Sequence, residues 1–277
     1  MNAATIGPDA HELRDLCVEA AQSAADLVLD QRQGELVTEA KTSGSDLVTA
    51  VDRAAEALIV ETILGRRPDD GLLGEEGTSR PGTSGVRWII DPIDGTTNFV
   101  LGHPGYSVSI AAEIGDRVVA GAVADPVHGD LYEAVLGDGA RCNGHPMRVR
   151  ATERVERAIV ATGFSYLAHR RRNQAQVLTT VLPEIADIRR MGSAALDLCS
   201  VGVGRVDAYY EIGLNEWDLA AGALIASEAG ATVRRRTITE VDPRHPDGPP
   251  LLVPLIVAST PPIADAIDEL LRRAGVR

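Results

Sequence analysis

The sequence predicts an α+β protein, and two regions with different hydrophobic patterns carry that prediction. Between about Trp88 and Val149, short strand-like runs are separated by Gly- and Asp-containing turns, a pattern typical of an antiparallel sheet. After about Arg154, strands alternate with helices, which indicates a layered arrangement. We therefore expect two halves, residues 1–154 and 155–277, that pack into one compact unit.

Two amphipathic helices open the first half. Apolar side chains recur at helical spacing over residues 12–32 and again over residues 46–64. A glycine and a proline end the second helix. A short strand is expected at residues 72–73, and the Pro-, Gly- and Ser-rich residues 79–85 are expected to form a loop.

The second half is predicted to alternate between strands and helices. The expected strands are residues 158–161, 188–191, 206–210 and 251–258. The expected helices are residues 168–182, 193–203, 218–229 and 262–273. Residues 242–250 are rich in proline and polar side chains and are predicted to form a mobile loop.

Composition excludes several classes of protein. No apolar run approaches the ~20 residues that span a bilayer, and the N-terminus lacks the pattern of a secretion signal. Cys17, Cys142 and Cys199 are too widely spaced for a disulfide framework or a zinc knuckle, so we expect a cytoplasmic protein. A net charge of −13 disfavours direct binding to nucleic acid or to an anionic membrane.

The most informative segment runs from Trp88 to Phe99. A hydrophobic strand leads into Asp91 and Asp94, and Gly95 follows where a helix can begin. Two ionised carboxylates about 4 Å apart repel by ~4 kcal/mol at an effective dielectric near 20, so this turn is expected to attract a cation. The backbone N–H groups after it can meet an anion at a helix N-terminus, which favours phosphate.

Other acidic residues stand at the edges of predicted elements. They are Asp46, Asp52, Glu75, Glu76 and Asp218. Each alone is ordinary, because Asp and Glu are common in turns, N-caps and first helical turns. Taken with Asp91 and Asp94, they form a set of hard oxygen ligands suited to Mg²⁺.

With these segments in this order, the chain resembles the inositol monophosphatase family of Mg²⁺-dependent phosphatases, part of the superfamily that includes fructose-1,6-bisphosphatases. The resemblance covers nearly the whole chain and implies an αβαβα sandwich. It rests on Gly74-Glu75-Glu76, Trp88 to Phe99, Gly192 to Asp197, Asp207 to Glu211, and Trp217 to Gly222.

The resemblance implies two to three Mg²⁺ ions in each active site. One ion would be held by Glu75, Asp91 and the backbone carbonyl of Ile93. A second would be held by Asp91, Asp94 and Asp218, so that Asp91 bridges the two. A third, weaker ion would be held through Glu75 and waters. Metal-activated water would then attack the phosphate directly, without a covalent phosphoenzyme.

The resemblance also assigns residues to catalysis and to the substrate. Glu75, Thr96 and Asp52 would be catalytic, with Thr96 and Asp52 orienting the attacking water. The substrate-binding residues would be Asp94, Gly95, Thr96, Ser165, Ala194 and Glu211. Without the resemblance, Glu211 reads equally well as a surface acid at a strand end. Lys41 and Asp46 fall in a mobile loop of the family that closes over a metal.

The predicted activity is hydrolysis of inositol 1-phosphate to inositol and phosphate. The alternatives are a broader sugar phosphatase that acts on fructose 1,6-bisphosphate or another small phosphate monoester, and a binding protein in RNA or transcription complexes. The partner expected is thus a small phosphorylated polyol, with no direct nucleic acid and no membrane. The family further implies a homodimer and sensitivity to lithium.

Two other phosphatase chemistries fit poorly. Haloacid-dehalogenase enzymes place their acids two residues apart, whereas Asp91 and Asp94 are three apart. Cys142 and Arg148 have the spacing of cysteine phosphatases, but the residues between them do not form a glycine-rich phosphate loop, so Cys142 is expected to be structural.

The run Arg170-Arg171-Arg172 has two interpretations. It is either a solvated helix face or a segment that reaches the substrate and admits a second phosphate.

Overall fold

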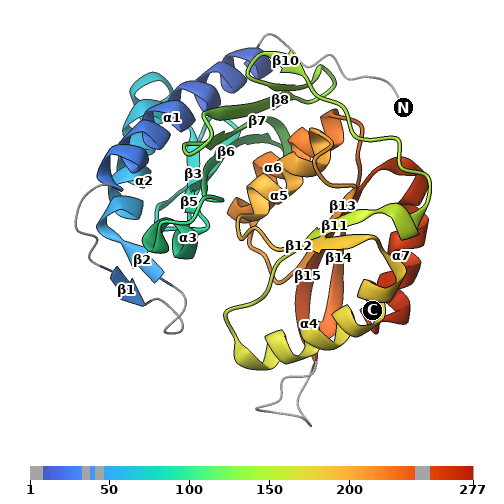
Figure 1. The fold of residues 1–277 in the computed structure, drawn as a ribbon. Coiled ribbons are helices and arrows are strands. Elements are labelled where there is room, and N and C mark those ends of the chain that lie inside the picture. Colours follow the sequence, from blue (N-terminus) through green and yellow to red (C-terminus); the bar gives the residue numbers. More distant parts are fainter. Residues whose placement is uncertain (1–8, 33–37, 41–46, 241–249, 277) are drawn as a thin grey trace.

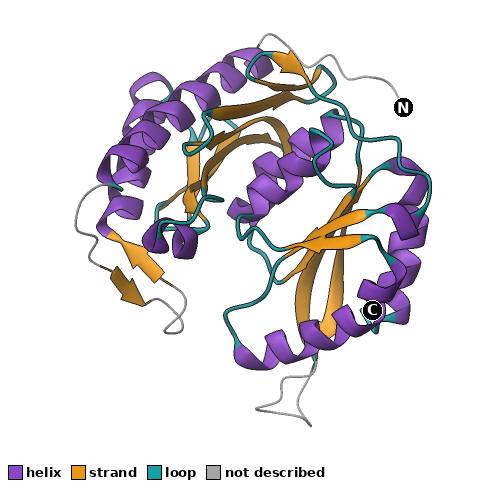
Figure 2. Ribbon diagram, viewed as in Figure 1, coloured by secondary structure: helices purple, strands orange, loops and turns teal. Residues whose placement is uncertain are grey.

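A computed structural model describes residues 9–32, 38–40, 47–240 and 250–276 of the chain. Within these ranges the fold is α+β and has five layers: helices, a sheet, helices, a second sheet and helices (Figures 1 and 2). The predicted fold class and its αβαβα layering are therefore confirmed. The division into residues 1–154 and 155–277 stays a proposal.

The first sheet has eight strands, and most of them form the antiparallel arrangement that the turns in the sequence predict. Its spatial order is β10-β9-β8-β7-β6-β5-β3-β4, and its neighbours are antiparallel except for the parallel pair β3 and β5. The strands are β3 (Gly71–Gly74), β4 (Ser79–Arg80), β5 (Val86–Asp94), β6 (Ser107–Ile114), β7 (Arg117–Asp125), β8 (Asp130–Val135), β9 (Gly139–Cys142) and β10 (His145–Pro146). A separate hairpin pairs β1 (Thr38–Ala40) with β2 (Leu47–Thr49).

Two helices cover the outer face of this sheet: α1 (Asp9–Gln31) and α2 (Ala50–Arg66). Leu13 on α1 packs in one core cluster with Trp88 and Ile90 of β5. The residue between them on β5, Ile89, joins a different cluster on the inner face of the sheet. Successive strand side chains point to opposite faces, so a strand covered on both sides is hydrophobic throughout.

The middle layer consists of α5 (Ala194–Gly202) and α6 (Glu216–Glu228), which lie between the two sheets. Every residue of α5 is buried. The two helices approach closely at Gly222, where an added Cβ would lie 3.0 Å from the Leu198 side chain. Most of the surface of these helices is apolar because both of their faces contact a sheet.

The second sheet has five strands in the order β12-β11-β13-β15-β14. They are β11 (Ile159–Thr162), β12 (Asp187–Arg189), β13 (Ala208–Ile212), β14 (Thr232–Glu240) and β15 (Leu251–Ser259). The first three run parallel, and β15 joins them antiparallel to β13 and β14. The outermost helices, α4 (Ala168–Val181) and α7 (Ala264–Arg273), cover the far face (Figure 1).

Most predicted elements are found within two or three residues of their expected ends, but three expectations were wrong. Residues 79–80 of the expected loop form strand β4, because they pair with β3. The second helix begins at Ala50 rather than at residue 46, because the Thr49 side chain caps α2 and residues 47–49 pair as a strand. Strand β14 was missed because three arginines interrupt its pattern. Two of them, Arg234 and Arg236, form ion pairs with Asp268 on α7.

Three other expectations concern the mobile loops, the cysteines and the absence of a membrane span. Lys41, Asp46 and residues 242–249 of the expected loop lie outside the described residues. Cys17 and Cys199 are buried and free, and Cys142 is free at the end of β9. None of the described helices is both long enough and apolar enough to cross a membrane.

Candidate active site

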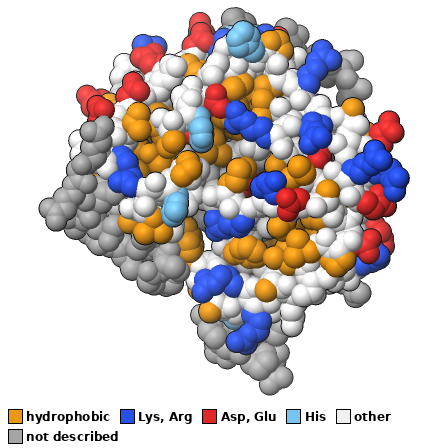
Figure 3. Space-filling model, viewed as in Figure 1, with side chains coloured by type: hydrophobic (Ala, Val, Ile, Leu, Met, Phe, Trp, Pro, Cys, Tyr) orange, Lys and Arg blue, Asp and Glu red, His pale blue; other side chains and the backbone are white. Residues whose placement is uncertain are grey.

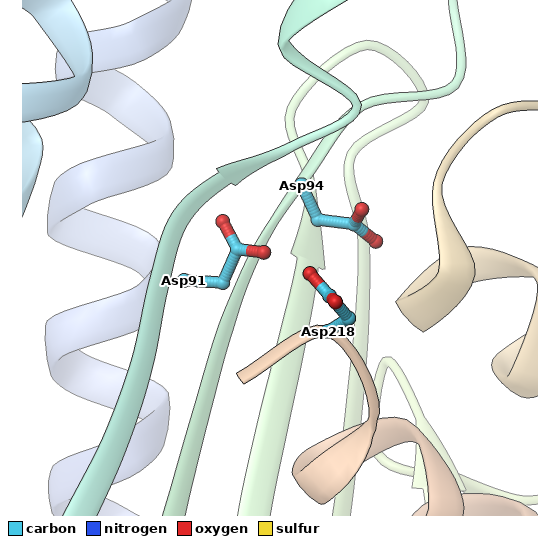
Figure 4. Close-up of side chains that lie close together, drawn as sticks. All are labelled: Asp91, Asp94 and Asp218. Atoms are coloured by element: carbon cyan, nitrogen blue, oxygen red, sulfur yellow. The ribbon is translucent and has the colours of Figure 1, made fainter. Parts of the chain in front are cut away.

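Three carboxylates from two distant parts of the chain meet between the first sheet and the middle helices. Asp91 and Asp94 lie at the end of β5, and Asp218 lies in the first turn of α6. One oxygen from each lies within 4.8 Å of the others, and Figure 4 shows their carboxylate groups gathered together. The separation of Asp91 and Asp94 depends on an irregularity in the β5–β6 pairing, which falls between these two residues.

The sharp turn after Asp94 depends on a glycine. Gly95 has φ +92°, a conformation that costs other residues free energy. A Cβ at this position would also lie 2.8 Å from the Gly105 carbonyl oxygen. The short helix α3 (Thr96–Leu101) then begins, so the chain turns from strand to helix within one residue of the acidic pair.

Each carboxylate is fixed by hydrogen bonds from the backbone. The Asp91 Oδ1 atom accepts from the Ile93 N–H at 3.1 Å. The Asp218 Oδ2 atom accepts from the Asn215 N–H at 2.6 Å, which closes a capping box at the start of α6. These bonds occupy one oxygen of each group and orient the whole carboxylate.

Asp94 is held by the N-terminus of α5. Its Oδ2 atom accepts from the Ser193 hydroxyl at 2.6 Å and from the Ala195 N–H at 2.7 Å. Ser193 is the N-cap of α5 and also accepts from the Leu196 N–H. Asp94 therefore ties the end of the first sheet to a helix of the middle layer.

Burial and mutual repulsion disfavour the charged form of these acids. Burial, followed by repulsion from Glu75 and Asp94, raises the pKa of Asp91 well above its usual value. The pKa of Asp218 is raised well above its usual value by burial and by Asp94, and burial raises the pKa of Asp94 to about 6. A divalent cation would offset both causes, and carboxylate oxygens are the ligands that Mg²⁺ prefers. The donor set thus fits Mg²⁺.

Thr96 connects the site to α2. Its Oγ1 atom lies 3.0 Å from the Ile93 carbonyl oxygen and 3.3 Å from Asp52 Oδ1. Asp52 is fully buried and caps α2 by accepting from the Thr49 N–H at 2.8 Å. Unlike Thr96 and Ile93, Asp52 does not line the pocket, and it contacts the site through Thr96.

These residues line a pocket of about 370 Å³ between the first sheet, the middle helices and the second sheet. The pocket brings together the other residues that the family resemblance assigned to metal, catalysis or substrate. They are Glu75, Asp91, Ile93, Asp94, Gly95, Thr96, Ser165, Ala194, Glu211 and Asp218. Glu76, the other acid of the Gly74-Glu75-Glu76 motif, does not line the pocket. Figure 3 shows the surface in the view of Figure 1, where Lys and Arg side chains, in blue, are scattered over the face and are more numerous on its right side.

Glu211 forms part of the pocket wall rather than a surface strand end. Its Oε2 atom accepts from the Tyr209 hydroxyl at 2.7 Å. Burial raises the pKa of Glu211 to about 7, although the Tyr209 hydrogen bond and the charge of Arg190 oppose the rise. The neighbouring Gly163 leaves room for this carboxylate, because an added Cβ there would lie 1.9 Å from Glu211 Oε2.

The three consecutive arginines divide by role. Arg170 lines the pocket, whereas Arg171 donates to the carbonyl oxygens of Ser165 and Tyr166 at 3.0 and 2.7 Å. Arg172 is exposed on α4. Consecutive residues of a helix point in different directions. The sequence could not show which of the three arginines faces the pocket, because that depends on where the helix lies in the fold.

Sequence reasoning missed other residues of the pocket. Arg190 lines it, and the buried Trp217 Nε1 has no hydrogen-bond partner among the described residues. Ser193, which holds Asp94, was also missed. A serine just before Ala-Ala-Leu is an N-cap signal, but nothing local indicates that it contacts Asp94, 99 positions earlier.

The chain belongs to the inositol monophosphatase family, which matches residues 9–272. The "Inositol-1-monophosphatase SuhB" of Mycobacterium tuberculosis is 45% identical over 250 residues, 87% of this chain and 83% of that protein. The "Nus factor SuhB" of Escherichia coli is 41% identical over 226 residues, 80% of this chain and 85% of that protein. The solved extragenic suppressor protein suhB of Bartonella henselae is 34% identical, with a TM-score of 0.84 over 94% of this chain and 98% of its own. The family predicted from the motifs is therefore confirmed.

Proposed function

We propose that the protein is a Mg²⁺-dependent phosphomonoesterase that hydrolyses inositol 1-phosphate to inositol and phosphate. The observation that carries the proposal is the convergence of Asp91, Asp94 and Asp218 in one pocket beside the start of α3. Family membership supports a phosphatase. The relative named an inositol-1-monophosphatase supports the inositol substrate.

Five residues would hold the ions. Glu75, Asp91 and the Ile93 carbonyl would hold one Mg²⁺, and Asp91, Asp94 and Asp218 would hold another. A third, weaker ion would depend on Glu75. When bound, the ions would lower the pKa of a water and offset negative charge on the phosphoryl oxygens.

The residues around the turn would position the reactants. The Thr96 hydroxyl, aligned by Asp52 and by the Ile93 carbonyl, would orient the attacking water. The backbone N–H groups of Gly95 and Thr96 would donate to the phosphate, which fits the preference of a helix N-terminus for anions. Direct attack by water requires no nucleophilic side chain.

The other end of the pocket would bind the polyol. The Glu211 carboxylate would accept hydrogen bonds from hydroxyl groups, the Ser165 hydroxyl would donate to one, and Ala194 would offer a backbone contact. A pocket wall with both hydrogen-bond donors and acceptors suits a polyol, because each hydroxyl group of a polyol can both donate and accept a hydrogen bond.

A phosphate-release assay tests the proposal. The substrates are inositol 1-phosphate, fructose 1,6-bisphosphate, histidinol phosphate and 3′-phosphoadenosine 5′-phosphate, each with Mg²⁺ and with EDTA. We expect Mg²⁺-dependent release that is fastest from inositol 1-phosphate, together with inhibition by millimolar Li⁺. Release from none of them would favour a binding role, which the name Nus factor of the Escherichia coli relative raises. Gel filtration would test the proposed homodimer.

A second candidate function is hydrolysis of a substrate with two anionic groups, such as fructose 1,6-bisphosphate. Arg170 and Arg190 line the pocket and supply positive charge there. An arginine guanidinium group can donate two parallel hydrogen bonds to the oxygens of one phosphate group.

Arg170→Ala tests this second candidate, with Arg172→Ala as the control. We expect the first change to raise KM for fructose 1,6-bisphosphate by roughly tenfold, since a charged hydrogen bond contributes about 1.5–3 kcal/mol. KM for inositol 1-phosphate should stay within about twofold in both variants. Equal effects of the two changes on the bisphosphate would refute a second anion subsite at Arg170.

A further inference from the structure

Helix α2 carries a second buried carboxylate, one turn after Asp52, that the proposed chemistry does not use. Glu56 is only 4% exposed, although glutamate is almost never fully buried unless it is paired. Residues four apart lie on the same face of a helix, so Asp52 and Glu56 both point from α2 toward the first sheet.

The Glu56 carboxylate binds the backbone of the turn that contains Glu75. Its Oε2 atom accepts from the Glu76 N–H at 2.8 Å, and its Oε1 atom accepts from the Thr78 N–H at 3.0 Å. A hydrogen bond from the Gly74 N–H to the Thr78 carbonyl oxygen, at 2.7 Å, closes the same turn. Both oxygens of Glu56 therefore hold one small loop of backbone.

The sequence of the turn is fitted to this contact. A Cβ at Gly74 would lie 2.4 Å from Glu56 Oε2, so only glycine leaves space for the carboxylate. At the other side of the turn, Gly77 has φ +110°, which glycine adopts without strain. The two glycines around Glu75 and Glu76 are thus explained by Glu56 and by the turn geometry, independently of any ligand.

Glu75 is held from both sides. Its own N–H donates to the Ile90 carbonyl oxygen of β5 at 3.1 Å, and the N–H of the next residue donates to Glu56. Asp52, on the same helix, contacts Thr96 in the turn after β5. Helix α2 therefore connects the two turns that carry Glu75 and Thr96.

We propose that Glu56 is a positioning residue that fixes the Glu75 turn relative to the Asp91–Asp94 turn and thereby sets the affinity of the site for divalent metal. The inference rests on the proposed role of Glu75 as a metal ligand. Outer residues that orient a ligand typically change metal affinity or activity by about 10- to 100-fold when they are altered. Glu56 acts on a backbone segment and does not itself line the pocket.

Glu56→Gln is the sharpest test, because it keeps the shape of the side chain. Glutamine has one acceptor oxygen, so either the Glu76 or the Thr78 N–H would face an amide donor instead. Mn²⁺ binding, measured by electron paramagnetic resonance without substrate, should weaken by roughly tenfold. At saturating metal, kcat should return to within about threefold of the parent, whereas KM for the substrate should stay unchanged.

Two variants separate positioning from stability. Ile63→Val removes one buried methylene from the same helix and should lower the melting temperature without changing Mn²⁺ affinity. Gly74→Ala should weaken Mn²⁺ binding as Glu56→Gln does, since its Cβ displaces the carboxylate.

The possible outcomes are distinct. Unchanged Mn²⁺ affinity in a folded Glu56→Gln variant would overturn the proposal, as would an equal loss of affinity in Ile63→Val. A parent protein that binds Mn²⁺ but releases no phosphate would refute the proposed function alone. Weaker Mn²⁺ binding by Glu56→Gln in that same protein would still support the role of Glu56.

Discussion

The two ends of the pocket are built differently. At the acidic end, Asp91, Asp94 and Asp218 are short side chains at element ends, and each has a carboxylate oxygen fixed by a backbone N–H. At the other end, Arg170 and Arg190 are long side chains with many rotamers. Short, hydrogen-bonded ligands on strands and helices hold their geometry more accurately than long side chains do. The difference indicates that the acidic end is preorganised to hold the proposed metal ions, whereas the arginine side chains are less constrained.

The largest effect is expected at the acidic end, from Asp94→Asn. The asparagine oxygen can still accept from Ser193 and Ala195, which leaves the NH₂ group facing the other carboxylates. A donor cannot bind a cation, so kcat should fall by at least about 100-fold, more than the loss from altering an outer residue. The metal-free melting temperature should not fall, because one source of repulsion is removed.

Asp138→Asn, in an exposed turn, is the control for Asp94→Asn and should retain parental kcat. If Asp94→Asn retained the parental kcat, the acidic end of the pocket would not hold the catalytic metal as proposed.

The stability of the metal-free protein should fall as the pH rises, because of the same carboxylates. A group whose pKa is higher in the folded protein than in the unfolded chain favours folding while it is protonated, and the benefit is lost as pH rises through the folded pKa. For Asp94, whose pKa rises from 3.8 to about 6, this amounts to roughly 3 kcal/mol. Asp91 and Asp218 change in the same direction.

Differential scanning calorimetry between pH 5 and pH 8, with EDTA or with Mg²⁺, measures this dependence. The melting temperature in EDTA should fall over the interval, and Mg²⁺ should raise it most at pH 8, where the carboxylates are charged. A Mg²⁺ effect that is equal at both pH values would contradict the mutual repulsion of these acids.

A smaller effect is expected at the polyol end, from Glu211→Gln. The amide oxygen can still accept from the Tyr209 hydroxyl, but a hydrogen bond to a neutral group is weaker than one to a carboxylate by about 1 kcal/mol. KM for inositol 1-phosphate should therefore rise roughly fivefold, with kcat nearly unchanged. The exposed Glu153→Gln serves as the control. A fall in kcat at constant KM would instead assign Glu211 to the chemical step.

The smallest effect is expected from Ser165→Ala. Its hydroxyl accepts from the Leu167 N–H at 3.2 Å, and its backbone is held by Gln174, so the loop should keep its shape without the hydroxyl. Loss of one neutral hydrogen bond, about 1 kcal/mol, should raise KM by about two- to fivefold. Steady-state kinetics with inositol 1-phosphate measures this effect. A lower melting temperature with unchanged KM would indicate that Ser165 stabilises only the loop.

Much of the fold was predictable because its signals are local. Helices α1 and α6 have clear start signals or periodicity, and the turns of the first sheet contain Gly and Asp. Strand β14 was not predictable, because Arg234 and Arg236 are accommodated by acids on α7, which is distant in sequence. The start of α2 was misplaced for a related reason, since residues 47–49 form a strand only by pairing with β1.

The sequence by itself determined the turn that holds Asp91, Asp94 and Gly95, because strand, bulge and helix start within a few residues of one another there. Only the tertiary structure decided that Asp218 and Ser193 meet this turn, since α5 and α6 must first pack between the two sheets. It also decided that Arg170 rather than its neighbours lines the pocket. The physical reason is that spacing along a chain fixes local geometry, whereas contacts across a fold depend on how buried faces pack.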